Sequence, residues 1–241
     1  MTRRLITLSA IALAVSACHF GADAEDRDPG SSVSRNYQLA AFDRIEVAGP
    51  YDVKVNTGGA PGASATGGEK LLDETEVVVE NGTLKIRAKK HKGMRFNWGK
   101  RGKAEFAVTT SMLHGAGIAG SGGIVVDKVD GDFKGGVAGS GDLRLAAVNG
   151  GTVELEIAGS GKITAAGTAA SAKVGIAGSG DVDAAGLVAK TAEVSIAGSG
   201  NVRANASDTA KVDIAGSGNV TVTGGAKCDV SKAGSGNVTC G

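Results

Sequence analysis

Residues 194–202 are Val-Ser-Ile-Ala-Gly-Ser-Gly-Asn-Val, and the central Ala-Gly-Ser-Gly occurs seven times in the chain. Successive copies are 19, 20, 19, 20, 18 and 18 residues apart, and they begin at Ala119, Ala138, Ala158, Ala177, Ala197, Ala215 and Ala233. Apolar residues around each copy alternate with small or polar ones, which is the period of a β-strand. Helical repeats need about 33 residues and propeller blades about 40. The pattern therefore predicts an all-β fold, a parallel β-helix (β-solenoid) of about seven coils.

Two columns of apolar residues are expected to form the core when these coils stack. The first column precedes each tetrapeptide and contains Ile118, Val137, Ile157, Ile176, Ile196 and Ile214. The second lies two residues after it and contains Ile124, Leu143, Ile163, Val182, Val202, Val220 and Val238. Such a core is thin, in agreement with a composition of 40 Gly and only 8 aromatic residues. The presence of only 3 Pro, with no Gly at every third residue, excludes collagen.

The two glycines of the tetrapeptide have two possible roles. Both face inward if strict alternation runs through the motif, whereas they supply positive φ if Gly-Ser-Gly forms a corner. We favour the corner, because inward glycines on every coil would leave voids. In both cases the serines form a ladder, a candidate binding face made of Ser121, Ser140, Ser160, Ser179, Ser199, Ser217 and Ser235.

A second polar column is expected two residues after these serines. It contains Gly123, Asp142, Lys162, Asp181, Asn201, Asn219 and Asn237. Only two members are carboxylates, and Lys162 separates them, so the column favours structural stacking of asparagines over a calcium site. The sequence predicts no metal site and no cofactor.

The last coil is bracketed by Cys228 and Cys240. In an oxidising compartment a disulfide is expected between them, because a metal site would need more ligands. The alternative is two free thiols. Lys232 takes the apolar position of this coil, and in a terminal coil its amine can leave through the open end.

The N-terminus has the order of a secretory signal peptide: Arg3 and Arg4, an apolar run, then small residues. The apolar run is too short to span a membrane. Val15-Ser16-Ala17-Cys18 resembles a bacterial lipobox, which would place a lipid on Cys18, while Ala22-Asp23-Ala24 suits ordinary cleavage. We expect a signal peptide over 1–17, a flexible tether over 18–36, an N-terminal β-rich part over 37–114 and the repeat solenoid over 115–241.

The N-terminal β-rich part is less regular and is expected to continue or cap the solenoid. Its segments 42–47 and 51–55 alternate as strands do, and Asn81-Gly82 indicates a hairpin with a type I′ turn. A loop of small residues is expected over 61–68 and a short helix over 69–76.

A cluster of nine basic residues without an acid runs from Lys85 to Lys103 and includes Phe96 and Trp98. Basic residues interleaved with aromatic ones suit a polyanion. The candidate site consists of Lys89, Lys90, Lys92, Arg95, Trp98, Lys100 and Arg101. The alternatives are a solvated loop, or aromatic side chains that cap the solenoid core. Nucleic acid is not an expected partner, because the net charge is only +1.

Three features together resemble the head-GIN domain family, a bacterial domain of unknown function labelled putative auto-transporter adhesin. They are residues 42–55 with a Gly-Pro turn, Glu80-Asn81-Gly82-Thr83-Leu84-Lys85-Ile86, and the Gly-Ser-Gly coils that follow. The resemblance spans roughly Tyr37 to the C-terminus. It implies a β-solenoid-like fold in an exported, often lipid-anchored protein, with no established catalytic residues.

These features predict a non-enzymatic protein of the bacterial cell envelope, an outer-membrane lipoprotein or otherwise a periplasmic or secreted one. The expected role is binding, adhesion or structural support. Its expected partners are a surface or envelope polymer or protein, the membrane through the lipid anchor, and another copy of itself. The alternatives are a polysaccharide-active β-helix enzyme and a polyanion-binding periplasmic protein. A groove in which Asp142, Asp181 and Arg144 converge would favour the enzyme, whereas a flat Ser/Asn ladder would favour binding.

Overall fold

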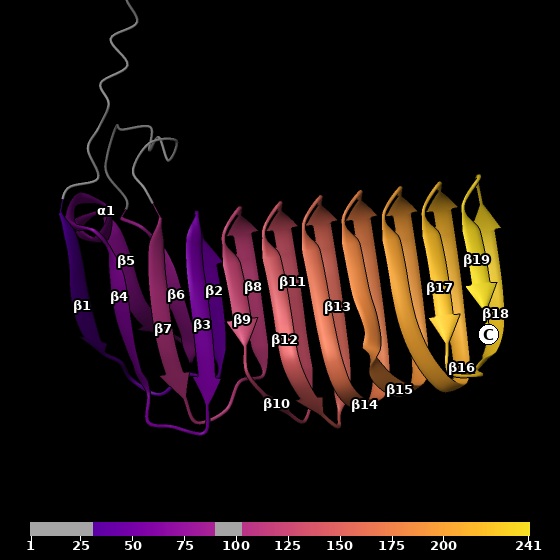
Figure 1. Cartoon of the computed structure of the whole chain (residues 1–241), viewed down its shortest axis with the longest axis horizontal. Coiled ribbons are helices and arrows are strands. Elements are labelled where there is room, and N and C mark those ends of the chain that lie inside the picture. The colour runs from indigo at the N-terminus through magenta and orange to yellow at the C-terminus, as the bar shows by residue number, and fades with distance from the viewer. Residues whose placement is uncertain (1–30, 90–102) are drawn as a thin grey trace, which may run out of the picture.

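The computed structural model describes residues 31–89 and 103–241, and these form one β-solenoid (Figure 1). Each coil contributes one strand to each of two stacks, and the predicted parallel β-helix is confirmed. The first stack, in pairing order, contains β5 (Thr75–Glu80), β6 (Thr83–Ala88), β2 (Arg44–Ala48), β8 (Gly115–Gly120), β11 (Phe133–Gly139), β13 (Thr152–Gly159), the C-terminal halves of β14 (Lys162–Gly178), β15 (Asp181–Gly198) and β16 (Asn201–Gly216), and β18 (Lys227–Ala233).

The second stack lies on the other side of the core. It contains β1 (Ser32–Gln38), β4 (Gly62–Gly68), β7 (Ala104–Thr110), β3 (Tyr51–Thr57), β9 (Gly123–Val126), β12 (Asp142–Asn149), the N-terminal halves of β14, β15 and β16, β17 (Asn219–Thr223) and β19 (Asn237–Cys240). The short β10 (Val129–Asp130) pairs with the end of β12. The antiparallel strands β1, β4 and β5 and the helix α1 (Glu69–Asp73) close the N-terminal end, whereas β18 and β19 end the rod (Figure 1).

Both predicted apolar columns form the core. In the first column Ile157, Ile176 and Ile196 are direct partners in successive parallel strands, and all are buried. In the second, Ile163, Val182 and Val202 stack in the same way. Each coil adds only a few buried β-branched side chains, so stability accumulates through contacts between neighbouring coils.

The two glycines of each tetrapeptide have different roles. The first has φ between 120° and 135° in all seven copies, as the corner interpretation requires. The second is buried and faces inward, as strict alternation requires: a Cβ on Gly180 would lie 2.6 Å from both the Gly161 carbonyl oxygen and Ile157 Cγ2. The isoleucine of the preceding coil thus fills the space, so no void forms.

The strand pair β2–β3 is a further coil of the same kind. Ala48 pairs with Ala119, and Gly49 has φ 135°, the value found at the other corners. Val47-Ala48-Gly49-Pro50-Tyr51-Asp52-Val53 therefore corresponds to Ile176-Ala177-Gly178-Ser179-Gly180-Asp181-Val182. This coil lies between the coil of β6 and β7 and the coil of β8 and β9, so chain order and spatial order differ there.

Tyr51 replaces the second glycine of this corner and is fully buried. Its ring packs edge-to-face on Phe106, with centroids 5.5 Å apart. Its hydroxyl lies 2.9 Å from Thr75 Oγ1, and Thr75 in turn donates to the Leu71 carbonyl at 2.7 Å. Because the Thr75 hydroxyl has a single proton, Tyr51 is the donor in this pair. The neighbouring β6 and β7 are joined by residues 89–103 instead of a four-residue corner.

The burial of Tyr51 predicts a loss of stability at high pH. Burial raises the pKa of its phenol to about 12, above the value of about 10 in an unfolded chain. The stabilisation is complete below pH 10 and is lost as the pH rises toward 12, because the unfolded state releases the proton first. Two pKa units correspond to roughly 2–3 kcal/mol. Urea unfolding at pH 9 and pH 11 should show a smaller pH-dependent loss for Tyr51→Phe than for the unaltered chain; equal losses would contradict the assignment.

Two predictions for the N-terminal part are wrong and two are confirmed. Residues 61–68 are not a loop, since β4 pairs antiparallel with both β1 and β7. The strand β1 begins at Ser32, inside the expected tether. It is an edge strand in which only Val33 and Tyr37 pack against the core, so its sequence indicated a strand only weakly. The hairpin is present, with φ 51° at Asn81 and 73° at Gly82. The helix α1 lies inside the expected 69–76.

Candidate functional site

The serines of the tetrapeptides form a ladder along one edge of the rod. All seven are exposed. Ser140, Ser160 and Ser179 each donate their backbone N–H to the corner glycine of the preceding coil at 2.9 Å. Because the backbone holds each corner on the one before, the hydroxyl groups are presented at the spacing of the coils, about 4.8 Å.

The expected stack of asparagines lies beside this ladder. Asn201 Nδ2 donates to Asp181 Oδ1 at 2.8 Å, and Asn219 Nδ2 donates to Asn201 Oδ1 at 3.0 Å. The backbone N–H of Asn237 donates to Asn219 Oδ1 at 3.3 Å. The prediction of structural stacking is confirmed. The serine ladder and this column are two residues apart in every coil, and we call them together the polar strip.

Arg203 and Asp183 extend the polar strip onto the adjoining face of the second stack, where they lie 3.7 Å apart. With Lys162, Asp181 and Asn201 they line a hollow of about 280 Å³. The hollow is open and contains both charge signs, so it offers hydrogen-bond donors and acceptors without a strong net field.

The residues named for an enzyme do not converge. Asp142 pairs with Lys162, which pairs with Asp181, so the two aspartates are two coils apart, about 10 Å. Asp181 lines the hollow, but Asp142 and Arg144 do not. Within residues 31–89 and 103–241, no three His, Cys, Asp or Glu side chains are grouped as a metal site requires. This arrangement matches the flat ladder that we associated with binding.

The basic cluster is partly neutralised by acids from outside its own stretch of sequence. Lys85 donates to Glu80 at 3.0 Å, and Arg87 donates to Glu76 at 2.7 Å. The hydrogen bond from Lys85 lowers the pKa of Glu80. Lys103 lies 3.5 Å from Asp52. Sheet pairing therefore brings acidic partners to both ends of a cluster that contains no acid in its own sequence.

Several predicted site residues fall outside the described residues. Lys89 is described and exposed. Lys90, Lys92, Arg95, Phe96, Trp98, Lys100 and Arg101 lie outside the described residues, as do Cys18 and the expected signal peptide. In the described part of the chain, no helix has the length and apolar character needed to cross a membrane.

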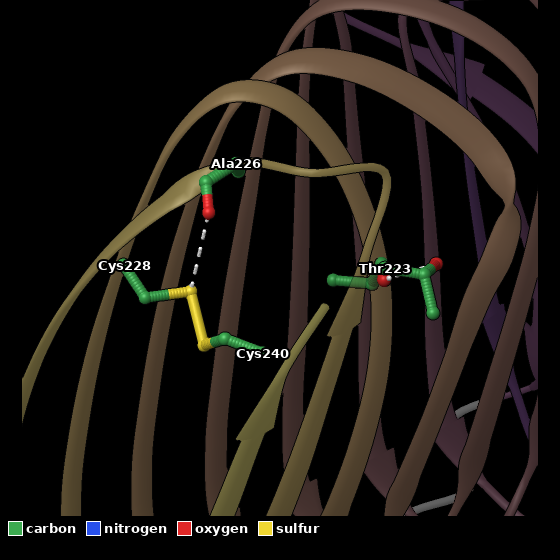
Figure 2. The surroundings of a disulfide bond; sticks show 5 residues. Thr223, Ala226, Cys228 and Cys240 are labelled. Atoms are coloured by element: carbon green, nitrogen blue, oxygen red, sulfur yellow. Dashed lines mark hydrogen bonds between the residues drawn. A yellow bond between two sulfur atoms is a disulfide. The ribbon is translucent and has the colours of Figure 1, made fainter.

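The expected disulfide joins Cys228 and Cys240 (Figure 2). It closes the last coil beside Ala226, whose carbonyl oxygen lies 3.8 Å from Cys228 Sγ. Lys232 takes the position that Ile214 has in the coil below, and its amine donates to the Gly236 carbonyl at 3.2 Å. The lysine thus spans its own corner where no further coil covers the core.

A shallow apolar groove of about 700 Å³ lies on the outer face of the first stack, which we call the alanine face. Its lining includes the tetrapeptide alanines from Ala119 to Ala197 and the side-chain-free Gly117, Gly136 and Gly175. This groove was not predicted from the sequence. In three of the coils, a glycine two residues before the tetrapeptide alanine could have indicated an open position on this face.

A column of alternating charge borders this groove. It contains Lys134, Glu154, Lys173, Glu193, Lys211 and Asp229, each paired in register with the next. Lys134 Nζ lies 3.1 Å from Glu154 and 3.3 Å from Glu156. The Lys134 hydrogen bond lowers the pKa of Glu154. We name these six residues the charge column. Their alternating sign, four residues before the alanines of their coils, is visible in the sequence, but no prediction was drawn from it.

Comparison with known proteins agrees with this geometry. A family model described as "Putative auto-transporter adhesin, head GIN domain" matches residues 41–226. The chain belongs to this family. Within the family match, the β2–β3 coil and the first six tetrapeptide coils share the same corner geometry. A search of curated proteins found no match.

Solved structures share the fold of this head-GIN chain. A putative lipid binding protein from Parabacteroides distasonis is 28% identical, with a TM-score of 0.73 over 89% of this chain and 98% of that one. A putative adhesin from Bacteroides fragilis is 21% identical, with a TM-score of 0.75 over 88% and 99%. A putative adhesin from Parabacteroides merdae is 20% identical, with a TM-score of 0.65 over 88% and 97%. The two adhesins, below 25% identity, inform the fold alone.

Proposed function

We propose that this chain is exported, anchored to the outer membrane through a lipid on Cys18, and serves as a non-enzymatic, adhesin-like binding module. Its partner is an extended, hydroxyl-rich polymer of the cell surface, held along the polar strip. The observation that carries this proposal is the exposed serine hydroxyl that repeats on all seven tetrapeptide coils, with asparagine amides beside it on the last three.

Repetition favours a polymer over a small molecule. Each tetrapeptide coil presents the same serine hydroxyl at about 4.8 Å intervals, so a chain with its own repeat can make the same contact many times. Contacts that are individually weak then add up through effective concentration. Membership of the head-GIN family, whose model is described as a putative auto-transporter adhesin, supports this proposal.

Export and anchoring are tested by the intact mass of the protein purified from membranes of its native host, with and without reduction. A diacyl or triacyl adduct on a chain that begins at Cys18 is expected, with a gain of two hydrogens on reduction. An unmodified chain that begins at Glu25 would contradict the anchor and favour a soluble periplasmic or secreted protein.

Binding is tested by co-sedimentation of the full chain with peptidoglycan sacculi and with whole cells stripped of protein. Asn201→Ala combined with Asn219→Ala should weaken binding about tenfold or more, since two adjacent contacts are lost. Ser199→Ala combined with Ser217→Ala probes the serine ladder in the same coils. Ser195→Ala, on the alanine face, is the matched control and should bind like the unaltered chain.

Equal binding by all of these variants would show that the polar strip is not the contact surface. Binding that depends on ionic strength but not on these residues would instead indicate that the basic cluster holds a polyanion.

A further inference from the structure

We infer that the alanine face is a self-association surface, on which two copies of this chain pack face to face with their rods antiparallel. This inference is independent of the polar strip, which lies on a different side of the coil. It rests on the shape of the face, the order of its charges and the area available.

The shape of the face allows two sheets to approach closely. The exposed positions nearest the corner are Ala119, Ala138, Ala158, Ala177 and Ala197, and three neighbouring positions are glycines. Face-to-face sheets normally lie about 10 Å apart. Glu46 and Glu156 also line the groove, but the other side chains are small and add little thickness, so backbones and methyl groups of two copies can pack without rearrangement of either core.

The charge column decides the relative direction of the two rods. In a parallel face-to-face arrangement the two-fold axis runs along the rods and reverses the strand direction. The charge columns of the two copies then lie at opposite edges of the interface, so their charges are not paired across it. When the rods are antiparallel and the two-fold axis lies between β11 and β13, each of Lys134, Glu154, Lys173 and Glu193 faces a residue of opposite sign or a neutral one. The column is therefore self-complementary in one direction only.

The position of the groove determines which coils of the two copies face one another. The groove extends from β2 to β15, and its middle lies between β11 and β13. A two-fold axis at that point places Lys134 opposite Glu154 of the second copy, and Ala138 opposite Ala158. One coil outward, Gly117 faces Gly175. Two coils outward, Arg44 of β2 faces Glu193 of β15, which adds a further pair of opposite charges.

Arg44 fits this role because it projects from the face above a glycine. It is exposed, and its register partners in the neighbouring coils, Thr83 and Gly115, are uncharged. A Cβ on Gly115 would be in ordinary van der Waals contact with Arg44 Cγ, at 3.5 Å, so the stem of Arg44 lies beside this open position. The guanidinium is thus presented at the end of the groove.

The area is sufficient for a weak dimer. A strand of seven residues is about 23 Å long, and six coils span about 24 Å, so the face covers roughly 550 Å². Two copies would together bury about 1,100 Å², slightly above the minimum of about 1,000 Å² for specific interfaces. We therefore expect association in the micromolar range or weaker.

Sedimentation equilibrium of the full chain, in density-matched detergent and from micromolar to millimolar concentration, tests the inference. The unaltered chain should form a dimer. Ala158→Trp, which places a bulky ring at the centre of the face, should remain monomeric. Thr221→Trp, the same replacement at an exposed position of β17 in the second stack, is the matched control and should still form a dimer.

Charge reversal at the two ends of the groove tests the register. Arg44→Glu should weaken the dimer about tenfold or more, because two like-charge pairs form across the axis. Combination with Glu193→Arg should restore association. A chain that stays monomeric at every concentration would overturn the inference, as would a dimer that Ala158→Trp leaves unchanged. A monomer that releases bound lipid when Ala158 becomes Trp would also overturn it, and would assign the groove to an acyl chain instead.

Discussion

Gly198→Ala is expected to be among the most destabilising single substitutions in the repeats. Gly198 has φ 135°, and a Cβ there would lie 2.1 Å from the carbonyl oxygen of Gly178 in the coil below. That oxygen accepts the backbone N–H of Ser199 at 2.9 Å, so it cannot move away without loss of a stacking hydrogen bond. Backbone strain and steric overlap together should reduce the free energy of unfolding by about 4 kcal/mol.

Gly136→Ala is the matched control, measured by urea unfolding in dilute protein. A Cβ on Gly136 meets nothing within 4 Å, and its φ is not in the positive range. This substitution should stabilise the fold by about 0.5 kcal/mol, since it restricts the unfolded chain. If Gly198→Ala and Gly136→Ala unfolded at similar urea concentrations, the close stacking of the corners would be refuted.

The second large effect is expected when Cys228 and Cys240 are both replaced by serine. The disulfide closes a loop with a sequence separation of 12 residues, for which the chain-entropy model gives roughly 3 kcal/mol. Only one neighbouring coil supports this one, through β16 and β17, and Val230 is 43% exposed where interior coils have buried residues. The last coil therefore depends on its cross-link more than on its core.

Hydrogen exchange measures this effect coil by coil. Amides of β18 and β19 should exchange about 100-fold faster in the double variant, because 1.4 kcal/mol corresponds to one factor of ten. Amides of β13 should be unchanged, since each coil contacts only its neighbours. The unaltered chain under reducing conditions should behave like the variant. Uniformly faster exchange along the whole rod would contradict a local role for the disulfide.

The N-terminal part shows why a repeat can be missed. The β2–β3 coil has the same corner as the others, but Pro50 and Tyr51 replace the serine and the second glycine, so a search for the tetrapeptide does not find it. Its neighbours in the chain are not its neighbours in space, since β6 and β7 stack on one side and β8 and β9 on the other. The sequence pattern that remains to indicate this coil is Ala48-Gly49 with Val47 and Val53 on either side.

The candidate site was predictable only in part. The serine ladder and the asparagine stack follow from the repeat, because residues at equal positions in successive coils must be neighbours. The acidic partners of Lys85 and Arg87 are also close in sequence, yet the hairpin pairing decides that Glu76 faces Arg87. The asymmetry between the two glycines of each corner depends on contact with the isoleucine of another coil.

The sequence by itself determined the coil, its length, its two apolar columns and the disulfide that closes its last turn. A constant period and alternating apolar residues leave no other way to bury those side chains. Only the tertiary structure decided which face carries a groove and where the irregular N-terminal strands enter the stack. These features arise between coils, from register and from the space that small residues leave open, and a linear pattern carries that information only after the stack is known.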